Sequence, residues 1–271
     1  MNKWAFAITG ILAGFLVQAE NVPGGIAVIG VAQDTSAARF QRHDLLLLDY
    51  RGDRFAIVGL PLKTKTGAHE LLVQTESGGS YTLGFSVADK AYREQHLTIK
   101  NKRMVDPLPQ DMERISRESK LMRDEYLSFN PLEGNPLPFN QPLSGIITSE
   151  FGFRRVLNGK PRNPHSGLDL DATTGTPIAS PAPGIITLAD EYFFNGNTVF
   201  INHGSGLISM VCHLSEIQVE VNQRVERGDI VGLVGATGRV TGPHLHWSVS
   251  LNGNRVNPLD LVNLQSRLKN L

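Results

Sequence analysis

Short apolar segments separated by turn-forming residues recur along most of this chain. In the first half these segments are Gly25–Val31, Asp44–Tyr50, Arg54–Leu62, His69–Thr75, Tyr81–Val87 and His96–Lys100. In the second half they include Gly184–Ala189, Asn197–Gly204, Leu207–Leu214, Asp229–Gly235 and Leu245–Gly253. The 27 glycines and 15 prolines among 271 residues supply the turns between them. The pattern predicts an all-β chain of short strands, paired mostly as antiparallel hairpins.

The order of these segments predicts two β domains joined by a linker. We expect a signal peptide at 1–19, a small β-sandwich at 20–105, a linker at 106–139 and a second β domain at 140–271, which carries the histidine motifs described below. Within the linker, Met112, Ile115, Met122 and Tyr126 recur at near-helical intervals among charged residues, which predicts an amphipathic helix that follows the breaker at 106–109 and ends near residue 127. The proline-rich stretch after this helix is expected to be extended. It could lie across a groove of the second domain and block it.

Two histidine motifs suggest a metal site. His165 and Asp169 stand four residues apart, and His244 and His246 are separated by one residue. Alternate residues of a strand point to the same face, so His244 and His246 are expected on one side of a sheet. The segment from His165 to Asp169 cannot be fully extended if both ends contact one ion, because its ends would then lie roughly 13 Å apart. Gly167 is expected to let it curl.

Zinc in hydrolases is usually held by three nitrogen or oxygen ligands, with a fourth position left for water. His165, Asp169 and one histidine of the second motif would supply such a set. Pro164 argues against a helical zinc motif at this place, and the chain contains no HExxH sequence. The residues therefore suggest a zinc site built on a β-sheet.

The segments around these histidines resemble the lysostaphin/LytM-type zinc endopeptidases of bacterial cell walls. The resemblance runs from about residue 143 to 261 and is carried by Ser144–Arg154, His165–Ala189, Gly196–Leu207, Cys212–Ser215, Val225–Val249 and Asn252–Leu261. The first domain more weakly resembles the immunoglobulin-like domain that precedes some of these peptidases. The resemblance implies one Zn²⁺ per chain, an open groove for a polymeric substrate, and peptidoglycan as that substrate.

By motif position, the resemblance implies that His165, Asp169 and His246 bind zinc. It implies that His213 and His244 are catalytic residues that do not bind the metal. A lone histidine in a strand is more often structural, and only the complete motif set favours a catalytic role for His213. The sequence does not say which of the two histidines accepts a proton and which stabilises the transition state. His43, His69, His96 and His203 are interpreted as structural or solvent-facing, and Cys212 as a poor metal ligand.

The N-terminus predicts export. Lys3 is followed by an apolar run from Trp4 to Val17 and by Ala19, which fits a secretory signal peptide cleaved after Ala19. The apolar run is shorter than the roughly 20 residues that cross a bilayer, so no permanent membrane anchor is expected. We therefore expect the protein in the periplasm or cell envelope. We also expect it to be a monomer.

Charge excludes one class of partner. The chain carries 26 basic and 26 acidic residues and has no basic stripe, which argues against nucleic acid. Three functions remain open: a zinc endopeptidase that cuts peptidoglycan, a catalytically inactive relative that binds the wall or activates an amidase, and a secreted protease for glycine-rich external substrates. The presence of all five residues favours the first over the inactive relative, and only substrate assays separate it from the third. The resemblance of the front domain favours D-alanyl–diaminopimelate cross-links as the bond. That domain would either target the enzyme or act as a spacer.

Overall fold

The computed structural model describes residues 21–131 and 134–271, and the predicted signal peptide lies outside them. The described chain is built mainly of β-strands with few helices, which confirms the all-β prediction. Among the described residues, no helix combines the length and the apolar character that a membrane span needs.

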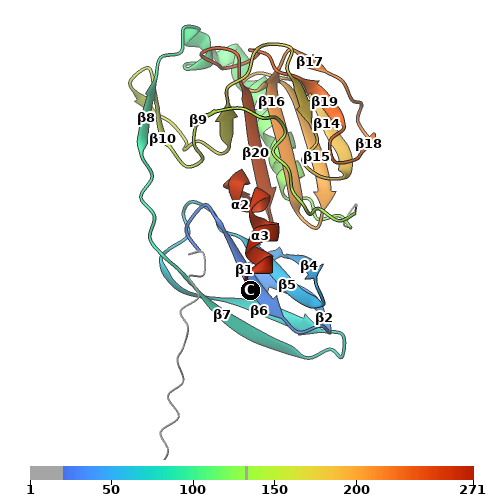
Figure 1. Cartoon of the computed structure of the whole chain (residues 1–271). Coiled ribbons are helices and arrows are strands. Elements are labelled where there is room, and N and C mark those ends of the chain that lie inside the picture. Colours follow the sequence, from blue (N-terminus) through green and yellow to red (C-terminus); the bar gives the residue numbers. More distant parts are fainter. Residues whose placement is uncertain (1–20, 132–133) are drawn as a thin grey trace, which may run out of the picture.

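The first part of the chain folds into two facing antiparallel sheets (Figure 1). One sheet has the order β1 (Ile26–Val31), β5 (Asp53–Gly59) and β4 (Leu46–Tyr50). The other has the order β3 (His43–Asp44), β2 (Thr35–Phe40), β6 (Gly67–Thr75) and β7 (Ser80–Val87). Alternate side chains of these strands point inward and form a shared apolar core that includes Phe40, Val58 and Leu71.

The second part of the chain is dominated by one large antiparallel sheet. Its order is β18 (Arg224–Val225), β14 (Gly184–Tyr192), β15 (Gly196–Gly204), β16 (Leu207–Leu214), β20 (Leu245–Leu251), β12 (Leu168–Leu170) and β9 (Ile147–Ser149). β21 (Asn254–Val256) pairs with β20 as the second arm of a hairpin. A smaller sheet has the order β13 (Pro177–Ala179), β19 (Ile230–Leu233) and β17 (Glu216–Ile217).

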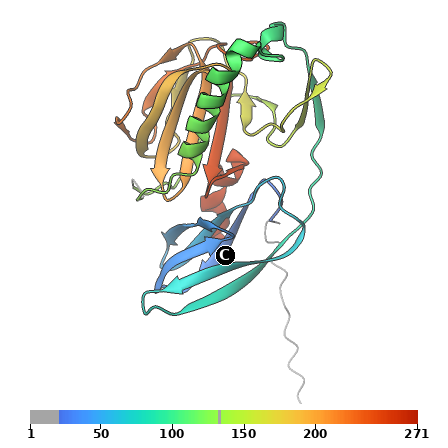
Figure 2. The same cartoon turned by 180° about the vertical axis from the view of Figure 1, so that it is seen from behind.

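The predicted linker helix is present and begins after the proline-containing breaker. Two short 3-10 turns, η1 (Lys102–Met104) and η2 (Pro109–Asp111), precede α1 (Met112–Tyr126). Pro107 and Pro109 lack the N–H group that a helix interior requires, which delays the start. Figure 2 shows α1 lying across the strands of the large sheet, where Tyr126 is buried against Phe200 with ring centroids 5.1 Å apart.

A third small sheet joins the two parts of the chain. β8 (Glu94–Leu97) runs parallel to β10 (Arg154–Leu157), which in turn pairs with β11 (Lys160–Pro161). This parallel pair differs from the predicted antiparallel arrangement. It arises because a connector of more than 50 residues separates the two strands, and a connection of that length permits a parallel crossover.

The two parts of the chain share one apolar core. A single cluster of buried side chains includes Ile26 and Ile57 from the first part and Leu207 and Leu251 from the second. Figure 1 shows α2 (Pro258–Val262) and α3 (Leu264–Lys269) between them. The Asn252 side chain also bridges the parts, because its Oδ1 accepts a hydrogen bond from Gly59 N at 2.6 Å and its Nδ2 donates to Gly59 O at 3.3 Å.

The proline-rich stretch runs along the face of the large sheet that is opposite to the metal motifs. Phe139 stacks on Trp247 with ring centroids 6.1 Å apart, and Trp247 points to the opposite face of β20 from its neighbour His246. The expectation that this stretch crosses the active-site groove is therefore wrong for its described residues, because Phe139 and Leu137 are core side chains.

Candidate metal centre

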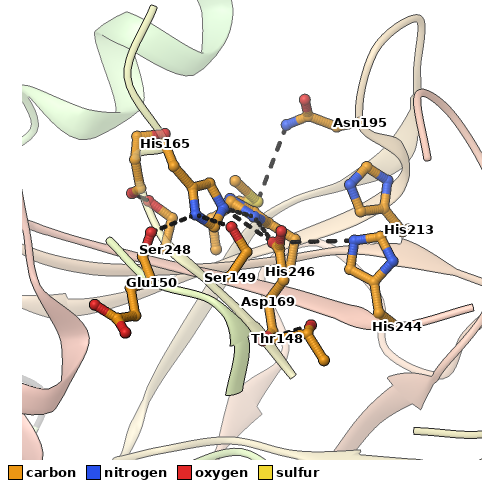
Figure 3. Close-up of polar contacts among 12 residues, drawn as sticks. Thr148, Ser149, Glu150, His165, Asp169, Asn195, His213, His244, His246 and Ser248 are labelled. Carbon is orange, nitrogen blue, oxygen red and sulfur yellow. Dashed lines mark hydrogen bonds and ion pairs between the residues drawn. The ribbon is translucent and has the colours of Figure 1, made fainter. Parts of the chain in front are cut away.

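Neighbouring strands bring three of the predicted residues to one point. His165 lies just before β12, Asp169 lies in β12, and His246 lies opposite Asp169 in β20. The three facing atoms form a triangle: His165 Nε2 to His246 Nδ1 is 3.0 Å, His246 Nδ1 to Asp169 Oδ1 is 2.7 Å, and His165 Nε2 to Asp169 Oδ1 is 2.9 Å. All three residues are buried, with exposed fractions of 2–9%. Figure 3 shows these side chains converging.

Gly167 lets His165 and Asp169 reach the same point. A Cβ atom on Gly167 would lie 2.4 Å from Trp247 O and 2.8 Å from the His246 ring. Only glycine lets the two chain segments approach this closely. The Ser248 hydroxyl donates to Ser166 O at 2.6 Å and fastens the same turn to β20.

The protonation of His165 shows that the triangle suits a cation. The Glu150 carbonyl can only accept, so His165 donates to it from Nδ1 at 2.8 Å. In the neutral ring, Nε2 then carries a lone pair that faces a carboxylate oxygen and a second imidazole nitrogen. Three electron-pair donors at this spacing repel one another unless a cation lies between them. Tetrahedral zinc with bonds of 2.0–2.1 Å would separate its ligand atoms by about 3.3 Å, close to the observed triangle.

Electrostatics favour the ligand forms of Asp169 and His246. Burial alone would raise the pKa of Asp169, but the adjoining His165 and His246 side chains outweigh it and hold this pKa well below its usual range. Burial lowers the pKa of His246 to about 4, against the opposing effect of its hydrogen bond to Asp169. A carboxylate and neutral imidazoles are the states that bind a metal.

His213 and His244 stand beside the triangle, each held by a backbone carbonyl. His213 Nδ1 donates to Thr237 O at 2.9 Å, and His244 Nδ1 donates to Gly242 O at 2.8 Å. In the neutral form, each ring therefore carries its lone pair on Nε2. The Nε2 atom of His244 lies 3.9 Å from Asp169 Oδ1. The His213 and His244 ring centroids are 5.1 Å apart, and those of His213 and His246 are 6.0 Å apart.

The backbone and burial of His213 set it apart from an ordinary strand residue. It has a φ of 67°, in the left-handed region that costs a non-glycine residue about 1–2 kcal/mol. Strain of this kind persists where surrounding contacts enforce it, and it clusters at functional sites. Burial, followed by the charges of His246 and His244, lowers the pKa of His213 well below its usual range. The ring is therefore neutral.

Two residues next to the triangle were missed by sequence reasoning. Arg155 Nη2 donates to Asp169 Oδ2 at 2.6 Å and to the Ser149 hydroxyl at 3.2 Å. The Ser149 hydroxyl lies 3.1 Å from His165 Nδ1 and donates to Gln95 Oε1 at 3.0 Å. Each of these contacts depends on a strand pairing, so no local motif in the sequence could have revealed them.

The remaining histidines lie away from the triangle. His69 packs against Phe85, and His96 is paired with Glu94. His203 was expected at a strand end and lies there in β15, but it is fully enclosed, hydrogen-bonded to Pro183 O at 2.7 Å and to the Ser209 hydroxyl at 2.8 Å. Cys212 is buried and unpaired, and burial raises the pKa of its thiol well above the usual range, so it is a poor ligand.

Comparisons with known proteins follow the same division of the chain. The model of peptidase family M23 matches residues 163–258, which contain all five predicted site residues. The model of the M23 N-terminal domain matches residues 19–90. A crystal structure from Pseudomonas aeruginosa described as a peptidase M23 is 40% identical, with a TM-score of 0.76, over 91% of this chain and 96% of that one.

Two curated relatives match the second part of the chain. The DD-carboxypeptidase/endopeptidase Mpg of Neisseria meningitidis serogroup B (strain MC58) is 40% identical over 117 residues, which are 43% of this chain and 27% of Mpg. The peptidoglycan DD-endopeptidase ShyA of Vibrio cholerae is 40% identical over 114 residues, which are 42% of this chain and 26% of ShyA. The match therefore spans little more than a quarter of each relative's length.

Proposed function

The chain belongs to peptidase family M23 and is a metallopeptidase, and we propose that it hydrolyses peptide cross-links of bacterial peptidoglycan with one zinc ion. The observation that carries the proposal is the triangle of two imidazole nitrogens and one carboxylate oxygen, 2.7–3.0 Å apart, with two further histidines beside it.

His165, Asp169 and His246 would hold the ion. Zinc in such a set lowers the pKa of a bound water towards 7 and polarises a peptide carbonyl. Arg155 keeps Asp169 oriented, because it binds the carboxylate oxygen that faces away from the triangle. The Glu150 carbonyl does the same for the His165 ring.

His213 and His244 would move protons and stabilise charge. Each presents Nε2 while its Nδ1–H is tied to a carbonyl, so neither ring can turn away without losing a hydrogen bond. One ring accepts the proton of the attacking water and passes it to the departing amine. The other ring, when protonated on Nε2, would donate a hydrogen bond to the oxygen on which negative charge develops. Effects of this kind are each worth about 10²-fold or more in rate.

The D-alanyl–diaminopimelate cross-link is the proposed bond. Its support is the similarity to Mpg and ShyA, whose names describe DD-endopeptidases. Cross-linked peptidoglycan lies outside the cytoplasmic membrane, so this function requires export. The signal-peptide pattern in residues 1–19 fits that requirement.

Digestion of purified sacculi of the diaminopimelate type tests the proposal. Zinc-loaded protein is expected to convert cross-linked muropeptide dimers into monomers, identified by mass, whereas the His246→Ala variant should leave the dimers intact. Intact dimers after treatment with zinc-loaded protein, or release of peptides from the sugar chain instead, would refute it.

A further inference from the structure

Arg239 carries a positive charge without a carboxylate partner among residues 21–131 and 134–271. Its half-buried guanidinium lies over the Phe194 ring, 4.5 Å from the ring centroid, and its backbone N–H donates to Phe194 O at 2.8 Å. These contacts orient the side chain without neutralising it. A guanidinium that is partly removed from water and unpaired is costly, so it calls for an anionic partner.

The loop that carries Arg239 is the one that holds both catalytic histidines. Thr237 O accepts the hydrogen bond of His213, and Gly242 O accepts that of His244. Arg239 lies between these two residues in the chain. Any shift of this loop would therefore move the two histidines and the guanidinium together.

Backbone contacts place the loop of Arg239 beside His213, because Thr237 N–H donates to His213 O at 3.4 Å and His213 N–H donates to Asn195 O at 3.0 Å. Cys212 lies opposite His246 in the β16–β20 pair, and its thiol is influenced by the charges of Asp169, Arg155 and Arg239. Burial lowers the pKa of Arg239 to about 10, and the positive charges of Arg155 and Arg162 add to this effect. Arg155 pairs with Asp169, and Arg162 pairs with Asp106. Among the described residues, Arg239 is therefore the one of these three arginines without a carboxylate partner.

We propose that Arg239 binds the free carboxylate of the residue on the amine side of the scissile peptide bond. The guanidinium is a planar fork that matches a carboxylate through two hydrogen bonds. In a D-alanyl–diaminopimelate cross-link, the scissile nitrogen is attached to a carbon that also bears a free carboxylate. A terminal D-alanyl–D-alanine bond has the same arrangement, whereas an internal bond of a glycine bridge has no carboxylate there.

This inference rests on the proposed function and specifies how the site would recognise its substrate. It makes Arg239 a specificity determinant, distinct from the histidines that carry out proton transfer. A cation at this position favours peptides with the carboxylate over otherwise identical peptides without it.

The test compares two synthetic cross-linked peptides that differ only at this carboxylate, which is free in one and amidated in the other. The purified zinc-loaded protein should show a kcat/KM about 10- to 100-fold higher for the free acid, the range expected for a charged hydrogen-bonded pair. In Arg239→Gln the ratio of the two kcat/KM values should fall to near one, and Arg239→Lys should keep part of it. Because the ratio is taken within each variant, a loss of folded protein cancels.

Arg117→Gln provides a control, because it removes the same charge from an exposed position on α1 and should keep the ratio of the unaltered protein. A ratio in Arg239→Gln equal to that of the unaltered protein would overturn the inference. So would an unaltered protein that cuts both peptides at the same rate. If the unaltered protein cuts neither peptide, the proposed function itself is wrong, and the inference falls with it.

Discussion

Backbone carbonyls hold three of the four histidine rings at the metal centre. Glu150 O accepts from His165, Thr237 O from His213 and Gly242 O from His244. A carbonyl only accepts, so each ring is fixed in the form whose second nitrogen faces the site. The fold therefore selects the histidine forms that the chemistry needs.

Replacing His246 and replacing His213 should have different effects. His246→Ala removes one of the three converging atoms, so both bound zinc and activity should be lost. His213→Ala leaves the triangle intact, so zinc should remain while kcat falls about 10²-fold or more. Metal analysis and turnover of the two purified variants check this. Equal metal loss in both variants would show that the division of roles is wrong.

Replacing Arg155 should weaken zinc binding. In Arg155→Gln the buried Asp169 carboxylate loses its 2.6 Å partner, and loss of such an outer contact typically costs about 10- to 100-fold in metal affinity. Competition with a chelator measures the change. Arg154→Gln is the matched control, because it removes the same charge at the adjacent position, where the Arg154 side chain is 67% exposed. Tighter zinc binding in Arg155→Gln would show that charge repulsion by the guanidinium, not orientation, is its main effect.

The convergence of the five proposed site residues could be predicted because their motifs are local and their flanking segments are specific. The spacing of His165 to Asp169 and of His244 to His246 is fixed within each motif. Gly167 marks the place where the first motif approaches strand β20 closely. Arg155 and Ser149 were not predictable, since their contacts arise only when β9, β10 and β12 come together. Which histidine carries which proton step is likewise absent from the sequence.

At the scale of elements, strands β14, β15, β16 and β20 follow the apolar runs seen in the sequence, because their hairpins are formed by residues close in the chain. The parallel pairing of β8 with β10 joins residues nearly 60 positions apart, and no local pattern specifies it. Helix α1 was expected from its periodicity, and its start after Pro107 and Pro109 was expected because proline disfavours a helix interior.

The packing of strand β15 makes stability depend on pH through His203. Burial lowers the pKa of His203 to about 4, whereas an unfolded histidine titrates near 6.5. As pH falls from 6.5 towards 4, the unfolded chain binds a proton that the folded chain does not. The free energy of unfolding should therefore fall, by about 3 kcal/mol from this residue alone.

Urea unfolding at several pH values measures this contribution. His203→Gln should lose less stability between pH 6.5 and 4 than the unaltered protein, although its stability at pH 7 is lower. The comparison isolates His203 from His246, whose pKa is also lowered to about 4. Identical pH slopes in the two proteins would contradict the assignment.

At the scale of the whole molecule, the shared core ties the two parts of the chain together. Ile26 and Ile57 pack in the same cluster as Leu207 and Leu251, and Asn252 bonds to the Gly59 backbone. Elements that share buried surface open together. We therefore expect a single unfolding transition, in which Trp247 fluorescence and the far-UV circular dichroism signal change at the same urea concentration. Two separated steps, only one of them accompanied by Trp247, would show that the parts are independent.

Metal titration of chelator-stripped protein tests the central claim most directly, with cleavage of cross-linked peptidoglycan as the readout. The stripped protein should be inactive, and its cleavage rate should rise in proportion to added zinc until one ion per chain is bound, then stay constant. Full cleavage by the stripped protein, or a rate that zinc does not change, would contradict the claim that His165, Asp169 and His246 hold the ion on which catalysis depends.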